Sequence, residues 1–287
     1  MMLYLRVVLA LSVAVSAVAG SMEKTFSYKG ADGESHIIEV YYPENHTAGN
    51  KASCFVFFHG GGWSSGDLDH GRPFCEYLAS RGMVALTVNY SMHSKEDAKK
   101  LPDGESRKRI CVMDGKSVLR WVKQHADELG IDPDRIVAGG ASAGAHISVL
   151  QMMDKEFSNP ADLQSINTEV QALVLLCPAF TLPERDRTPE MNVFQYLEKE
   201  FPPMLFIVGE TDKWKTASDK LIADLKERKQ PVEVWMGTDV GHMFFRTRDW
   251  MTPTLLQIDA FLAAEGFLVG ETGLQMSEGD QELVPIP

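Results

Sequence analysis

The chain has 287 residues, of which 44% are hydrophobic and 24% charged, and it carries a formal net charge of -12 at pH 7. This length suits one α/β domain or two small domains, and it is ample for a large core. The excess of acidic residues repels phosphate groups, so the composition argues against nucleic acid or an anionic membrane surface as a partner.

The first residues differ in character from those that follow. Arg6 lies in a short basic start, residues 7–15 are apolar, and Ala17-Val18-Ala19 is a small-residue site of the A-x-A type. This pattern predicts a cleavable signal peptide over residues 1–19. An uncleaved membrane anchor is the alternative, but the apolar stretch is short for a membrane span. We therefore expect a secreted or periplasmic protein with no membrane contact beyond this signal.

The first half of the mature chain alternates between strand-like and helix-like segments. Two β-rich runs, 25–29 and 37–42, flank the Gly/Asp turn 30–33 and predict a hairpin. Continuous apolar runs predict strands buried on both faces, and periodic apolar spacing predicts helices. The predicted strands are 54–58, 83–88 and 135–138; the predicted helices are 72–81, 110–129 and 145–153; residues 91–106 read as a loop.

The second half continues the alternation. We predict strands at 172–176, 204–208 and 232–235, and helices at 217–228 and 254–264. Residues 179–202 are rich in Pro, Glu and Arg and are interpreted as a small cap over a site. Such an order indicates a mostly parallel sheet covered by helices on both faces. Without repeats or an interdomain linker, residues 20–270 form one predicted domain, and the acidic tail 271–287 is expected to be mobile.

The four cysteines are too few and too scattered for a disulfide scaffold or a zinc cluster. Cys54 and Cys177 lie in apolar runs and are interpreted as buried thiols. Cys75 and Cys111 lie on separate predicted helices, and in an oxidising compartment they could form a disulfide.

The segment Gly139–Gly144 follows a predicted strand and precedes a predicted helix. Residues 140–144 match G-x-S-x-G, a sharp turn that raises a serine hydroxyl above the end of a sheet. Ser142 is therefore the candidate nucleophile. The pattern alone is weak, since a plain Gly/Ser loop would look similar.

A nucleophilic serine needs a base and an acid that orients the base, and in such sheets they follow the serine in the order acid, then histidine. Asp212 comes just after the strand 204–208, and His242 follows the strand 232–235. Glu210 and Asp239 are rival acids. The alternative roles are a helix-capping carboxylate and a surface loop histidine.

The sequence His59-Gly60-Gly61-Gly62-Trp63 ends a predicted buried strand. Backbone N–H groups of Gly61 and Gly62, together with that of Ala143, are predicted to stabilise a developing oxyanion. A phosphate-binding loop is the alternative, but no Lys-Ser/Thr pair follows. His59 is interpreted as a brace for the loop, whereas the position of Trp63, in the core or beside a pocket, stays open.

Two other polar residues are interpreted as structural. His146 lies one turn after Ser142, but helical side chains point back toward the helix N-terminus, away from an elbow serine. Asp114 reads as a solvated or capping charge. The remaining histidines show no paired metal-ligand spacing.

In these motifs and in their order, the chain resembles the α/β-hydrolase superfamily, within it the esterases related to hormone-sensitive lipase. The stretches 81–85, 114–117 and 131–136 also resemble exported bacterial acetyl esterases, including enzymes that deacylate plant polysaccharides. The resemblance implies an eight-stranded, mostly parallel sheet with a small cap. Ala141 departs from the Asp that is usual in the hormone-sensitive-lipase branch, which weakens the assignment to that branch.

Residues and resemblance together predict a serine carboxylesterase that acts through an acyl-enzyme on small-molecule or carbohydrate esters. Ser142, Asp212 and His242 are the expected catalytic residues, and no metal or cofactor is expected. The resemblance favours short acyl groups, such as acetyl or feruloyl groups on plant carbohydrate. A peptidase or amidase of the same fold, or a catalytically silent binding protein, is the alternative.

Overall fold

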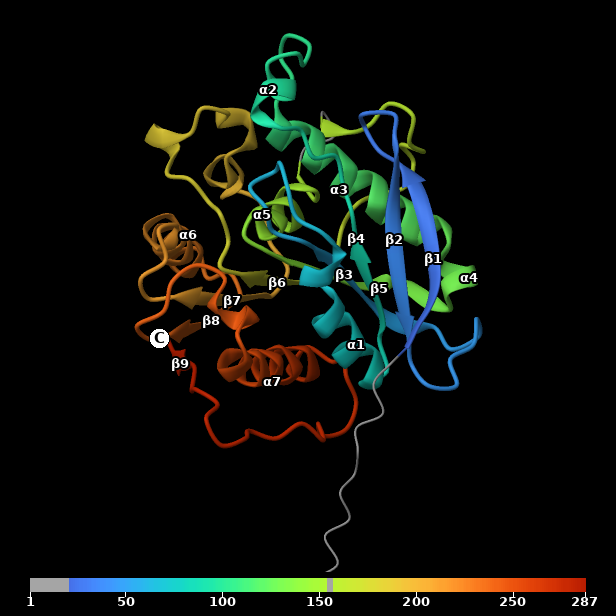
Figure 1. The fold of residues 1–287 in the computed structure, drawn as a ribbon, viewed down its shortest axis with the longest axis vertical. Coiled ribbons are helices and arrows are strands. Elements are labelled where there is room, and N and C mark those ends of the chain that lie inside the picture. Colours follow the sequence, from blue (N-terminus) through green and yellow to red (C-terminus); the bar gives the residue numbers. More distant parts are fainter. Residues whose placement is uncertain (1–20, 154–156) are drawn as a thin grey trace, which may run out of the picture.

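The computed structural model describes residues 21–153 and 157–287, and the predicted signal peptide at 1–19 lies outside this part. The described chain forms one nine-stranded sheet in the order β1-β2-β4-β3-β5-β6-β7-β8-β9 (Figure 1). The strands are β1 (Ser21–Lys29), β2 (Ser35–Tyr42), β3 (Ala52–Phe58), β4 (Val84–Val88), β5 (Ile131–Ala141), β6 (Ala172–Leu176), β7 (Met204–Gly209), β8 (Val232–Gly237) and β9 (Val284–Pro285).

The middle of the sheet is parallel and the margins are antiparallel. Strands β4, β3, β5, β6, β7 and β8 pair in parallel, whereas β1–β2, β2–β4 and β8–β9 are antiparallel pairs. Strands β4 and β6 are buried along their whole length. This burial explains why the parallel strands read as continuous apolar runs, since helices cover both of their faces.

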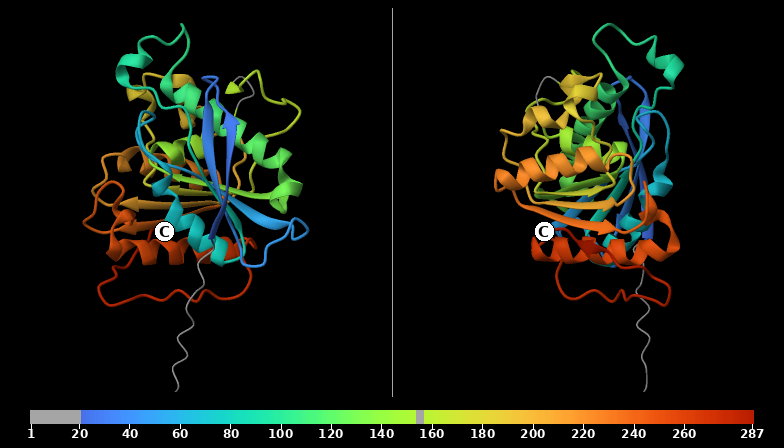
Figure 2. Two further views of the ribbon diagram at one scale, coloured as in Figure 1. Left: turned by 45° about the vertical axis from the view of Figure 1, so that its right-hand side comes forward. Right: turned by 90° about the vertical axis from the view of Figure 1, so that its left-hand side faces the viewer.

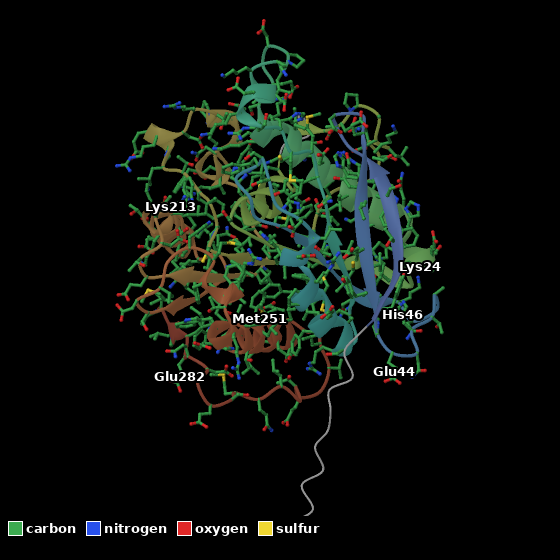
Figure 3. All side chains as sticks on the ribbon, in the orientation of Figure 1. Lys24, Glu44, His46, Lys213, Met251 and Glu282 are labelled. Carbon is green, nitrogen blue, oxygen red and sulfur yellow. The ribbon has the colours of Figure 1, made fainter. Side chains whose placement is uncertain are left out.

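Seven α-helices of the described residues surround the sheet, and side chains fill the layers between sheet and helices (Figures 2 and 3). They are α1 (Arg72–Ser80), α2 (Lys95–Ala98), α3 (Arg107–Gln124), α4 (Ala126–Leu129), α5 (Ala143–Leu150), α6 (Lys215–Glu227) and α7 (Arg248–Ala264). Helices α1 and α7 contribute to one buried apolar cluster, and α3, α5 and α6 contribute to the other. No helix in the described ranges is long and apolar enough to cross a bilayer.

The expected α/β-hydrolase fold is confirmed, with one strand more than the eight expected. The additional strand is β9, which lies in the tail that the sequence predicts to be mobile. That expectation is wrong for the end of the tail, because β9 pairs with β8 and Ile286 donates its N–H to Val234 O at 2.9 Å.

A proline in α7 explains a second contact of the tail. Pro253 lies inside the helix and has no N–H to donate to the carbonyl of Asp249, four residues earlier. The N–H of Gln281 donates to that carbonyl instead, at 2.8 Å. The tail therefore satisfies a backbone acceptor that the helix leaves free.

The cysteines are all buried and free, so the disulfide hypothesised between Cys75 and Cys111 is wrong. Cys75 belongs to the apolar cluster under α1, and Cys111 to the cluster on the opposite face of the sheet. The sheet itself separates the two thiols. Two buried thiols on opposite faces cannot be bridged without moving the backbone.

Residues 179–202, the predicted cap, form three short 3-10 helices rather than a separate layer: Pro183–Arg185, Pro189–Met191 and Val193–Tyr196. An ion pair between Lys108 of α3 and Asp186 joins this segment to the body of the protein at 2.8 Å. Asp186 also accepts hydrogen bonds from Thr188 and Asn192. These interactions of one carboxylate add to the burial of Phe180, Met191 and Val193, which pack into the apolar core.

Candidate active site

Ser142 lies in a sharp turn between β5 and α5. Its φ and ψ are 54° and -114°, a combination that a residue with a side chain rarely adopts. A Cβ on Gly140 would lie 2.4 Å from the carbonyl oxygen of Phe58, and a Cβ on Gly144 would lie 1.9 Å from the same atom. Both positions of the turn therefore require glycine, because the start of α5 crosses directly over the end of β3.

The structure brings Ser142, His242 and Asp212 together in one chain of hydrogen bonds. Nε2 of His242 lies 2.8 Å from Oγ of Ser142. Its Nδ1 lies 2.8 Å from Oδ2 of Asp212. A carboxylate accepts, so Nδ1 carries the proton in the neutral ring and leaves Nε2 as the acceptor for the serine hydroxyl. The three side chains thus have the order that proton transfer from the serine requires.

Asp212 and His242 come from the loops after β7 and β8. The two loops are packed against each other, since a Cβ on Gly209 would lie 2.5 Å from the carbonyl oxygen of Gly241. Asp212 is 7% exposed, and one of its oxygens also accepts the N–H of Trp214 at 3.0 Å. The rival acid Glu210 is directed elsewhere and accepts the N–H of Asp239.

The Gly60–Gly62 loop lies against Ser142. A Cβ on Gly60 would be 3.3 Å from Cβ of Ser142, so the loop passes within van der Waals distance of the serine. Within the described chain, no acceptor bonds the N–H groups of Gly61, Gly62 or Ala143. Backbone donors left free next to a nucleophile can stabilise an oxyanion, which agrees with their predicted role.

Two buried histidines near the site are structural, as the sequence predicts. The Nδ1–H of His59 donates to the carbonyl of Gly60 at 2.9 Å, and its ring stacks on Tyr90. Burial lowers the pKa of His59 to about 4. His146 donates from Nε2 to Met191 O, and burial lowers its pKa to about 3. Both rings are therefore neutral at pH 7 and cannot compete with His242 as a base.

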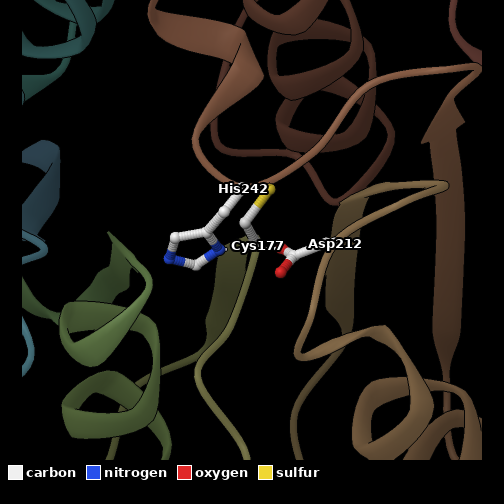
Figure 4. A group of neighbouring side chains, drawn as sticks. All are labelled: Cys177, Asp212 and His242. Carbon is white, nitrogen blue, oxygen red and sulfur yellow. Dashed lines mark hydrogen bonds and ion pairs between the residues drawn. The ribbon is translucent and has the colours of Figure 1, made fainter.

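The buried thiol expected at Cys177 lies beside the site, a position that the sequence does not indicate. Cys177 follows β6 with a φ of 43°, and its side chain lies next to Asp212 and His242 (Figure 4). Burial, reinforced by the negative charge of Asp212, raises the pKa of this thiol to about 12. Cys177 is therefore a protonated, neutral neighbour of the carboxylate.

The atoms of Cys177, Asp212 and His242 lie within 4.8 Å of one another, and in the described chain this is the one group of such residues that could surround a metal ion. A cation here would need Nδ1 of His242, which already contacts Asp212. The donor set thus fits the hydrogen-bonded chain better than a metal.

Asp114 differs from the prediction of a solvated charge. It is fully buried and accepts the N–H groups of Ala31 and Ser91, each at 2.6 Å. Burial raises the pKa of its carboxyl despite these hydrogen bonds. The residue ties the β1–β2 turn to the end of β4, and it has no contact with the serine.

Known proteins match the chain in both sequence and structure. The BD-FAE family model matches residues 38–182. Carboxylesterase NlhH of Mycobacterium tuberculosis is 32% identical over 141 residues, which are 48% of this chain and 40% of that protein. AB hydrolase superfamily protein C1039.03 of Schizosaccharomyces pombe is 33% identical over 38% of this chain and 29% of its own length. The chain thus spans less than half the length of these curated relatives.

A solved structure covers more of the fold. Esterase 2 of Thermogutta terrifontis, phosphonylated by cyclosarin, superimposes with a TM-score of 0.78 and 29% identity over 86% of this chain and 96% of that one. The same esterase with propionate bound covers 90% of this chain with a TM-score of 0.78. With its parallel sheet, its serine turn and these relatives, the chain belongs to the BD-FAE family of α/β-hydrolases.

Proposed function

We propose that the protein is a serine carboxylesterase. The observation that carries the proposal is the hydrogen-bonded chain from Ser142 through His242 to Asp212. It lies beside three backbone N–H groups that have no acceptor in the described chain. A nucleophile, a base, an acid and an oxyanion site are the parts that acyl transfer needs.

In the proposed reaction, Nε2 of His242 takes the Ser142 proton while Oγ attacks the ester carbonyl carbon. The carbonyl oxygen gains the negative charge, and the N–H groups of Gly61, Gly62 and Ala143 stabilise it. The protonated His242 then gives its proton to the leaving alcohol, and an acyl-enzyme remains. Water, deprotonated by His242, attacks the acyl-enzyme, and the carboxylic acid and free Ser142 are released.

The acyl groups we propose are short. The esterase of Thermogutta terrifontis has solved structures with propionate and with butyrate bound, which supports small acids as products of this chain as well. The resemblance to acetyl esterases that act on plant polysaccharides extends the proposal to acetyl or feruloyl groups on carbohydrate. The predicted signal peptide at residues 1–19 supports a secreted or periplasmic enzyme, for which polymers outside the cell are accessible.

Two alternatives use the same fold. A peptidase or amidase would use the same residues, but the small cap at 179–202 offers little surface to select a peptide chain. A silent binding protein would not need the complete chain of hydrogen bonds that Ser142 makes here. The ester hydrolase therefore explains more of the observed geometry.

Turnover of p-nitrophenyl acetate and butyrate by the purified protein tests the proposal, with Ser142→Ala as the control. We expect the variant to lose activity by about a millionfold, which leaves only the residual rate that the oxyanion site and substrate binding support. Mass spectrometry after treatment with a phosphonylating inhibitor should place the adduct on Ser142. An inactive wild-type protein, or an equally active variant, would contradict the esterase proposal.

The finer proposals have their own measurements. A panel of acetylated xylan, feruloyl esters and longer acyl chains distinguishes among substrates. N-terminal sequencing of the native protein tests export, since a mature chain that still contains residues 1–19 would rule out the cleaved signal.

A further inference from the structure

A cavity of about 460 Å³ lies between the cap and the N-terminal end of α3. Helix α2 and the cap lie at the same end of the molecule and form part of its wall (Figures 1 and 2). The residues that matter for its chemistry are two tryptophans, Trp63 and Trp214, and a group of cationic side chains.

Three segments of the cavity wall begin at residues of the site, although Ser142 and His242 do not themselves line the cavity. Trp63 follows the Gly61-Gly62 pair directly, and Trp214 donates its backbone N–H to Asp212. The third segment starts at Ala179 and reaches the wall at Thr181. The N–H of Ala179 donates to the carbonyl of Ser142 at 3.0 Å. A group in the cavity would thus be close to an ester held at Ser142.

Trp63 places a rigid aromatic ring in the cavity wall at this position. Its side chain is only 8% exposed, yet no described residue accepts a hydrogen bond from its indole Nε1–H. The ring is fixed edge-on against His146 at 5.2 Å, and the backbone of Trp63 has a φ of 59°. The indole nitrogen is itself enclosed by protein atoms, so Trp63 offers the cavity its apolar ring rather than a hydrogen-bond donor.

The cations of the cavity are not balanced by the acids that line it. Asp186 is paired with Lys108, and Glu105 is paired with Arg109. The other cationic residues of the wall, Arg107, Arg185 and Arg187, form no ion pair with any residue in the described ranges. The protein has a net charge of -12, so three such arginines around one cavity form a local exception. Guanidinium groups bind carboxylates through paired hydrogen bonds.

We propose that this cavity binds the alcohol half of the ester, and that this alcohol carries a carboxylate, as an acidic sugar does. The inference rests on the proposed esterase function and specifies its substrate class. The ring of Trp63 packs against the alcohol, and the arginines bind the carboxylate at the open side of the cavity. The acyl group stays at Ser142, so the charge selects the leaving alcohol and takes no part in bond making.

The test uses ester pairs that share their acyl group. The pairs are 4-acetoxybenzoate with 4-acetoxybenzamide, and an acetylated methyl glucuronoside with the corresponding acetylated glucoside. Within each pair, we expect kcat/KM to be about tenfold or more higher for the anionic ester, the size of one charge-assisted hydrogen bond. Added salt should reduce this preference, since the arginines are partly exposed.

The double variant Arg185→Gln, Arg187→Gln should raise KM for the anionic ester by about tenfold and leave the neutral ester within about twofold. The double variant Arg228→Gln, Arg248→Gln is the matched control, because both arginines are exposed and lie outside the cavity, and their replacement removes the same two charges. The control should leave the KM for both esters unchanged.

A failure of this inference and a failure of the proposed esterase function give different results. Equal turnover of the two esters by the wild-type protein, or equal effects of the double variant and the control, would overturn the inference and leave the esterase intact. Turnover of neither ester, together with none of p-nitrophenyl acetate, would overturn the proposed function and the inference with it.

Discussion

The turn that holds Ser142 and the cavity next to it differ in how tightly the fold constrains them. Around Ser142, even the Cβ of an alanine at Gly144 would collide with the carbonyl oxygen of Phe58. The cavity wall is partly exposed and charged, and part of it consists of 3-10 turns that Asp186 joins to α3. The proposed reaction needs fixed geometry and thus occupies a turn that has no room for larger residues, whereas selection among substrates is left to the more open wall.

The largest effect is expected where the chemistry depends on one hydrogen bond. Asp212→Asn keeps the shape of the side chain but removes the carboxylate that orients Nδ1 of His242, so kcat should fall by about 10⁴-fold. Steady-state kinetics with p-nitrophenyl acetate measures this change. Glu210→Gln is the control and should stay within about threefold, since Glu210 bonds the backbone of Asp239 and not the histidine. A large loss in the control would make Glu210 the orienting acid.

The next effect concerns stability in the same turn. Gly144→Ala should lower the free energy of unfolding by about 3 kcal/mol or more, because the backbone of β3 must move to admit the methyl group. Urea denaturation followed by tryptophan fluorescence measures the loss. Gly273→Ala has open space around it and should be close to neutral. Equal midpoints for the two variants would show that the turn is less constrained than the structure indicates.

Acid should lower the stability of the folded protein through His146, whose ring packs against Trp63 between the serine turn and the cavity. The pKa of His146 is lowered by burial to about 3 in the folded protein, against about 6.5 in an unfolded chain. The unfolded state therefore binds the proton first, so the stability present above pH 6.5 is lost as the pH falls toward 3. Within this window, each unit by which the pH falls lowers the free energy of unfolding by about 1.4 kcal/mol through this group. The loss between pH 6.5 and 4.5 is about 2.5 kcal/mol.

Urea titrations at a series of pH values, for the wild type and for His146→Gln, measure that contribution. The variant has no imidazole at this position, so its stability should depend less steeply on pH over that window. Identical slopes would mean that His146 is already protonated in the folded protein, or that it is not buried.

The smallest effect is expected in the cap. Asp186→Asn removes the charge that pairs with Lys108 but keeps the side-chain oxygen, so the free energy of unfolding should fall by about 1 kcal/mol. The KM for a carboxylate-bearing ester should fall by a few fold, because Lys108 then adds its positive charge to the cavity. Calorimetry and the ester pairs described above provide the two readouts. A loss as large as that of Gly144→Ala would remove the contrast between the two regions.

The same contrast explains what the sequence could predict. The turn at Ser142, the strand-end positions of Asp212 and His242, and the Gly61-Gly62 loop are encoded in short segments with specific residue types, and the structure brings all of them together. Such local requirements can be read without knowing the fold.

Features that join distant segments could not be read in this way. The contact of Cys177 with Asp212 depends on the alignment of β6 and β7, and the cavity combines segments from Trp63 to Trp214. The prediction of a mobile tail is wrong for a similar reason. The N–H of Gln281 donates to the carbonyl of Asp249, and this carbonyl is free only once α7 has formed around Pro253. Tertiary pairing of this kind leaves no periodic pattern in the residues involved.

The two margins of the sheet bear on whether copies of the protein can aggregate. A β-sheet grows by adding strands to its outer edges, and an open edge is a template for another molecule. At one edge, β9 has only two residues, and Pro285 offers no N–H to an incoming strand. At the other edge, β1 carries the exposed lysines Lys24 and Lys29. Both margins of the described sheet therefore disfavour the addition of a strand from a second copy, which matters during folding because non-local strand pairing is slow.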